Sequence, residues 1–255
     1  MQLRPFLICS FFIVLTLQTL PAASRSKTRF RALAIAETGG GHMLFDEAAK
    51  IWLNKLAADS NFTIDYINDT KPITKKYLSK YKLFIQLDYP PYPWSLVARE
   101  AFEDYITKGK GGWVGFHHPT LLGIFDGYPM WQWYSSFMGE IMFRAHIPGG
   151  TSAMLNVEDR DHPVMKGLPQ SFITKDEWYI YNKSPRPGVH VLASIDESTY
   201  EPEKDVKMGD HPVVWTNEHM KARNVYIAMG HFPGLFEDNA YTTLVRNAIF
   251  WAVRK

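Results

Sequence analysis

The pattern of apolar and polar positions predicts strands that alternate with helices in the first half of the chain. Residues 31–36 form a continuous apolar run, which is typical of a strand buried on both faces. Apolar residues then recur at helical spacing over 45–56, and residues 62–66 alternate as in a half-buried strand. The same alternation of elements continues with strands at 83–87 and 111–116 and a helix at 95–107 between them.

The second half of the chain predicts mainly strands. Their ranges are 152–157, 177–181, 189–195, 213–217 and 225–229, and a last amphipathic helix covers 241–253. Strands joined through helices imply right-handed crossovers and a parallel sheet with helices on both faces. We therefore expect one α/β domain over 28–255, with a mostly parallel sheet and antiparallel strands added in the second half.

The N-terminal segment predicts export. Arg4 precedes an apolar run from Phe6 to Leu20, and the small residues of 21–24 follow it. A run of this length is short for a membrane span and is typical of a signal peptide covering 1–24. A retained N-terminal anchor is the alternative. The mature domain is expected to be secreted or periplasmic, with no stable membrane span after cleavage.

Composition narrows the classes of function. Cys9 is the only cysteine and lies within the predicted signal peptide, so the mature domain has no disulfide, thiol nucleophile or thiolate metal ligand. A net charge of +2 gives no electrostatic case for nucleic acid. Aromatic residues make up 15% of the chain, which suits either stacking on sugar rings or an ordinary core.

Polar residues follow four of the predicted strands. In open parallel sheets, ligands bind at the carboxyl ends of the strands. The residues placed there are Glu37 and His42, Asp88 and Tyr89, His117 and His118, and His231. Three such ends carry histidine, which favours a functional site over chance placement.

The histidines and one carboxylate are the candidates for chemistry. His117 lies where a nucleophile would lie in related α/β hydrolases, but an imidazole there is suited to binding a metal or transferring a proton. Since adjacent side chains point apart, we expect only one of His117 and His118 to face the site; backbone-bonded histidines are the alternative. We assign His42, His117 and Glu177 as catalytic. His42, His117 and His231 are the expected ligands of a divalent metal such as zinc.

Glu177 has a competing interpretation, because adjacent acids such as Asp176 and Glu177 are usually a solvated turn pair. The expected substrate-binding residues surround the candidates for chemistry: Gly40, Gly41, Tyr89, His118, Trp133, Trp178 and Tyr179. The loop of three glycines could equally be a plain turn, and the aromatic residues at 131–134 could pack in the core. The loop matches neither the dinucleotide fingerprint nor the P-loop, so we expect no nucleotide cofactor.

At these residues the chain resembles the trehalose-utilisation (ThuA-like) family. The matching segments are spread over the mature chain: 39–42, 111–117, 161–164, 167–169, 176–179, 211–215, 230–231 and 246–252. The resemblance implies a flavodoxin-like three-layer sandwich similar to class I glutamine amidotransferases. It also implies that His117 stands in place of the amidotransferase cysteine, and that the substrate is a carbohydrate.

We therefore expect an exported enzyme that processes a glycoside, disaccharide or keto-sugar through a histidine and carboxylate site, with metal assistance. A non-catalytic sugar-binding protein on the same fold is the main alternative. A cysteine-independent amidase or peptidase ranks last, because the chain has no Gly-x-Ser-x-Gly segment. The sequence leaves the exact sugar and the oligomeric state open.

Overall fold

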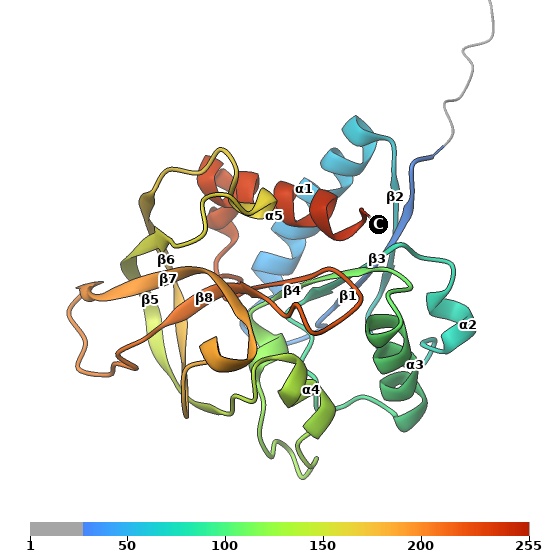
Figure 1. The fold of residues 1–255 in the computed structure, drawn as a ribbon, viewed down its shortest axis with the longest axis horizontal. Helices are drawn as coiled ribbons and strands as arrows, with labels where there is room; N and C mark the ends of the chain where they lie inside the picture. Colours follow the sequence, from blue (N-terminus) through green and yellow to red (C-terminus); the bar gives the residue numbers. More distant parts are fainter. Residues whose placement is uncertain (1–27, 255) are drawn as a thin grey trace, which may run out of the picture.

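The computed structural model describes residues 28–254, so the predicted signal peptide lies outside the described residues. Nine strands form one sheet in the order β2-β1-β3-β4-β9-β8-β7-β5-β6 (Figure 1). The first five strands in this order are parallel to one another. Their bounds are β1 Arg31–Ala36, β2 Thr63–Ile67, β3 Leu83–Leu87, β4 Gly112–Phe116 and β9 Asn224–Ile227.

The other half of the sheet is antiparallel. It consists of β5 (Phe143–Val157), β6 (Ser171–Tyr181), β7 (His190–Glu201) and β8 (Pro212–Thr216). β5 begins nine residues earlier than the 152–157 strand predicted from sequence, because an irregular register between Ile147 and Thr151 interrupts its alternation. The expected α/β flavodoxin-like fold, parallel first and antiparallel later, is confirmed.

Helices cover both faces of the sheet (Figure 1). α1 (Met43–Ser60) and α5 (Asn239–Ala252) lie on one side, and α2 (Lys75–Leu78), α3 (Leu96–Thr107) and α4 (Gln132–Phe137) lie on the other. The sequence did not predict α2 and α4, because elements of one or two turns carry little periodicity. Among residues 28–254, no helix has the length and apolar character that a membrane crossing requires.

Gly112 allows α5 to pack directly on the start of β4. A Cβ added at Gly112 would lie 2.2 Å from the carbonyl oxygen of Ala252, which is backbone and cannot move cheaply. Gly112→Ala is therefore expected to lower the free energy of unfolding by about 1–3 kcal/mol, measured by urea denaturation. Gly234→Ala is the control, because a Cβ at Gly234 would have no heavy atom within 4 Å. Equal losses in the two variants would contradict the packing argument.

Candidate active site

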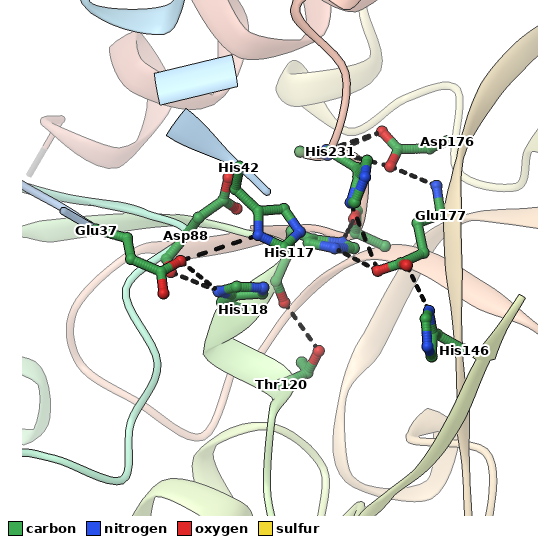
Figure 2. Close-up of polar contacts among 12 residues, drawn as sticks. Glu37, His42, Asp88, His117, His118, Thr120, His146, Asp176, Glu177 and His231 are labelled. Atoms are coloured by element: carbon green, nitrogen blue, oxygen red, sulfur yellow. Dashed lines mark hydrogen bonds and ion pairs between the residues drawn. The ribbon is translucent and has the colours of Figure 1, made fainter. Parts of the chain in front are cut away.

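Four histidine rings form a cluster at the carboxyl ends of the parallel strands (Figure 2). His42 precedes α1, His117 and His118 follow β4, and His231 follows β9. The ring centroid of His42 lies 5.2 Å from that of His117, 4.0 Å from His118 and 4.4 Å from His231. The structure thus brings together the three histidines that the sequence proposes as metal ligands.

The backbone at His117 is strained. Its φ of 57° and ψ of −87° are rarely adopted by a residue with a side chain, and such strain is concentrated at functional sites. The His117 N–H donates to the Ile227 carbonyl at 3.0 Å, while its carbonyl accepts from the Thr120 and Tyr226 hydroxyls at 3.0 and 2.8 Å. These bonds hold the turn in place.

This turn also corrects the expectation that His117 and His118 point apart. Left-handed backbone at His117 interrupts the strand alternation, and His118 begins a 3-10 turn (His118–Thr120). Both rings therefore lie in the cluster, stacked with centroids 5.2 Å apart. The backbone-bonded alternative also holds in part, because each ring contacts a carbonyl through Nδ1.

The backbone carbonyls fix the tautomer of both rings. Nδ1 of His117 lies 2.9 Å from the Ala228 carbonyl, and Nδ1 of His118 lies 2.7 Å from the Asp88 carbonyl. A carbonyl only accepts hydrogen bonds, so Nδ1 carries the proton. Burial lowers the pKa of His117, and this effect outweighs the raising effect of Glu177 beside it, so that the pKa is about 4. At neutral pH the Nε2 atom of His117 therefore carries a lone pair.

Glu177 lies at the centre of the cluster. Its Oε2 is 3.3 Å from Nε2 of His117 and 3.6 Å from Nδ1 of His231, and its Oε1 contacts Nδ1 of His146 (Figure 2). Burial raises the pKa of Glu177, but the neighbouring His117 and His231 rings together lower it well below the ordinary value. Glu177 is thus an ionised carboxylate, and it raises the pKa of His231 in turn.

Asp176 and Glu177 are both buried in the middle of β6, so they are not a solvated turn pair. The carboxylate of Asp176 accepts from the backbone N–H groups of Glu177, Gly230 and His231 at 2.6, 2.9 and 3.2 Å. Burial nevertheless raises the pKa of Asp176 to about 7. Asp176 therefore ties the segment that carries His231 to the strand that carries Glu177.

Three further site residues were not assigned a role from sequence: Glu37, Asp88 and His146. Oε2 of Glu37 lies 3.1 Å from Nδ1 of His118 and 3.9 Å from Nδ1 of His42. Burial lowers the pKa of His42 to about 2, aided by the three neighbouring histidines. The sequence places Glu37 and Asp88 at strand ends near the expected ligand but gives neither a role. For His146, which follows Arg144 in a segment of irregular pattern, the sequence suggests only that it could line the pocket.

Of the predicted substrate-binding residues, some lie in the site and others pack away from it. The Tyr179 ring lies in the site, 4.1 Å from the His117 ring. Trp178 was wrongly assigned, because alternation along β6 directs it to the opposite face from Glu177, where it is fully buried and donates to the Thr151 carbonyl. Trp133 contacts the aromatic rings of α3 and α4, as in the core-packing alternative.

The roles of the other predicted substrate residues remain predictions. Gly40 and Gly41 lie in the loop between β1 and α1, with Gly40 in the left-handed region at φ 81°. Tyr89 follows β3 and its ring packs against Trp94 at 6.2 Å.

Two overlapping groups have the donor atoms to hold a cation. The ligand atoms of His42, His117, Glu177 and His231 lie within 4.8 Å of one another, and so do those of Glu37, His42 and His118. Nε2 of His42 and Nδ1 of His231 are buried and have no hydrogen-bond partner. Nitrogen and carboxylate oxygen at this spacing are the donors that zinc prefers.

Comparisons with known proteins agree with this fold. The model of a family described as trehalose utilisation (ThuA) matches residues 31–252. A solved ThuA-like protein from Bacteroides uniformis is 32% identical, with a TM-score of 0.81 over 93% of this chain and 96% of that one. A ThuA-like protein from Parabacteroides merdae is 19% identical, with a TM-score of 0.65 over 89% and 90% of the two chains.

A further similarity is to part of a larger enzyme. The β-galactosidase from Bacillus circulans is 17% identical, with a TM-score of 0.53 over 87% of this chain and 30% of that chain. At this identity the similarity concerns the fold alone. No curated protein matches the chain.

Proposed function

We propose that this chain, which belongs to the trehalose-utilisation (ThuA) family, uses a divalent cation held by His42, His117, His231 and Glu177 to process a small carbohydrate. The observation that carries the proposal is the contact between His117 and Glu177. Nε2 of His117 and Oε2 of Glu177 are both lone-pair atoms, and they face each other across 3.3 Å in a buried site. A cation between them removes this repulsion.

The remaining donors fit the same cation. Low pKa values keep His42 and His117 neutral, which is the form that binds a metal, and Glu177 is ionised. The Ala228 carbonyl holds the His117 ring from behind, as in metal sites where the second nitrogen of a ligating histidine donates to a carbonyl. The unpartnered nitrogens of His42 and His231 would complete the set.

A bound cation would supply Lewis-acid polarisation of a carbonyl or hydroxyl oxygen of the sugar. The chain supplies proton transfer beside it. His146 contacts Glu177 through Nδ1, and its side chain is 47% exposed, so its other nitrogen can reach a substrate hydroxyl. Burial raises the pKa of Tyr179 far above the ordinary value, so its hydroxyl stays protonated as a donor beside the His117 ring.

A pocket beside His231 offers room for the sugar. Its volume is about 500 Å³, and Ile173, Lys175 and Phe232 are among its lining residues. The Phe232 ring lies 4.6 Å from the His231 ring. Alternation along β6 places Ile173, Lys175 and Glu177 on one face, and the Cα atoms of Ile173 and Glu177 would be about 13 Å apart. A disaccharide could thus extend from the cation over this row.

The test combines metal content with turnover. Purified protein is expected to hold about one equivalent of zinc or a similar ion, measured by elemental analysis. It is also expected to convert at least one member of a panel of disaccharides, aryl glycosides and keto-sugars. A chelator should abolish turnover and added metal should restore it. Turnover unaffected by the chelator, in protein without bound metal, would contradict the metal proposal. Sugar binding without turnover would favour a binding protein.

A further inference from the structure

A second cavity lies at the amino ends of the parallel strands, opposite to the ends that carry the histidines. Its volume is about 830 Å³. Residues that precede the strands line it: Arg29 and Phe30 before β1, Lys82 before β3, Gly111 before β4 and Arg223 before β9. A five-residue strand is about 16 Å long, so this cavity and the histidine site are separate.

The cavity concentrates positive charge. Six basic residues that line it make no ion pair with a carboxylate among residues 28–254: Arg29, Lys82, Lys221, Arg223, Arg246 and Arg254. No described aspartate or glutamate lines it. The whole chain has 28 basic and 26 acidic residues, so the excess here is local and does not follow from the net charge.

The negative ends of three helices offset only part of this positive charge. α1, α3 and α5 all end near the cavity, where Ser60, Gly109 and Ala252 line it. Each helix C-terminus carries roughly half a negative charge, so three of them offset only about −1.5 of six positive charges. The remaining charges repel one another unless an anion binds between them.

Three of the guanidinium groups are held in place by aromatic rings. Those of Arg29 and Arg246 lie over the Phe250 ring, 5.4 and 5.5 Å from its centre. The guanidinium of Arg223 lies 5.3 Å from the centre of the Trp251 ring and donates to the Trp251 carbonyl at 3.3 Å. Ordering before binding lowers the entropy cost of holding a ligand.

We propose that this cavity binds an anion with two or more neighbouring phosphate or sulfate groups. Arginine presents a planar set of N–H donors that matches the oxygens of such groups, and lysine adds point charges. The cavity volume is within the range of small-molecule sites. A soluble ligand and the headgroups of an anionic lipid share this chemistry, so the experiment separates the two sources.

The test is titration calorimetry of the full chain with inorganic pyrophosphate at low salt. The Arg29→Ala/Arg246→Ala variant should bind at least about 10-fold more weakly, while Lys75→Ala/Lys76→Ala, which removes two exposed charges elsewhere, should bind as wild type. Added salt should weaken binding to the unaltered chain. If the arginine variant is less stable, Lys82→Ala/Lys221→Ala replaces it, because these lysines make no described ring contact.

Vesicles of phosphatidylglycerol and of phosphatidylcholine form the second arm. Binding of pyrophosphate that the cavity variant loses supports a soluble ligand. Selective binding to phosphatidylglycerol vesicles without pyrophosphate binding, again lost in the cavity variant, supports a lipid headgroup. Absence of both, or equal loss in the control variant, overturns the proposal. Sugar turnover should be unchanged in the cavity variant, so this test fails or succeeds independently of the histidine site.

Discussion

Glu177→Gln is expected to lower turnover of the sugar substrate by about 100-fold or more and to weaken zinc binding by at least about 10-fold. Glu177 contacts His117, His231 and His146, so in the proposed site its carboxylate is both a cation ligand and the partner of three histidine rings. Glutamine keeps the shape but removes the charge and replaces one acceptor oxygen by a donor. The measurements are kcat/KM and a zinc titration.

The pKa of His231 gives a readout that does not depend on turnover. The nearby Glu177 carboxylate, 3.6 Å from Nδ1 of His231, is the largest cause of its raised pKa. Glu177→Gln should therefore lower that pKa, which can be followed by NMR titration of the metal-free protein. Glu218→Gln is the matched control, since Glu218 also pairs with a histidine, His190, at 2.8 Å but near the surface. An active Glu177→Gln variant with an unchanged His231 pKa would refute the assignment.

The parallel strands could be predicted closely from sequence. The ranges predicted for β1 and β3 agree with the structure, because both strands are buried on both faces and appear as short continuous apolar runs. The strand that continues through the irregular segment before Thr151 could not be predicted, since its alternation is broken there. As a result, the sequence proposes only that His146 could line the pocket, and its contact with Glu177 could not be predicted.

Most of the site histidines could be located because ligands bind at the carboxyl ends of parallel strands. The direction in which each side chain points depends on the local backbone conformation. His118 faces the cluster because one residue, His117, has a positive φ. Trp178 is different: with Glu177 facing inward on a strand, alternation alone places Trp178 on the other face. That correction was available from the sequence, whereas the His118 orientation was not.

His211 shows that a residue of a family-like segment can serve the fold. Its ring is buried, with Nδ1 2.8 Å from Oε1 of Glu197 and Nε2 3.1 Å from the Tyr179 carbonyl. The Tyr200 hydroxyl also lies 3.0 Å from Nδ1 of His211. Glu197 also accepts from the N–H groups of Met208 and Gly209 at 2.6 and 2.8 Å. This buried pair links β7 to the strand that carries Tyr179.

Glu197→Gln is expected to lower the free energy of unfolding by about 3–5 kcal/mol at neutral pH, because it leaves the buried His211 ring and two backbone N–H groups without their carboxylate partner. Urea denaturation measures the loss. Glu218→Gln, which breaks the more exposed pair with His190, should cost less than about 1 kcal/mol. Similar losses in the two variants would show that burial does not set the strength of the Glu197 pair.

The pH dependence tests the same pair. Burial raises the pKa of Glu197, but the bonds from His211, Met208 and Gly209 lower it by a larger amount. The pKa is therefore about 2, compared with an ordinary 4.5. A lowered folded-state pKa contributes stability that is present above about pH 4.5 and is lost as the pH falls through about 2. Glu197→Gln should therefore remove about 3 kcal/mol of the stability that the unaltered chain loses in that pH window.

The effect of Glu197→Gln on turnover separates folding from chemistry. The His211 ring contacts the backbone of Tyr179, so turnover at pH 7 should fall far less than in Glu177→Gln. A comparable fall would mean that the pair positions Tyr179 for chemistry as well as stabilising the fold.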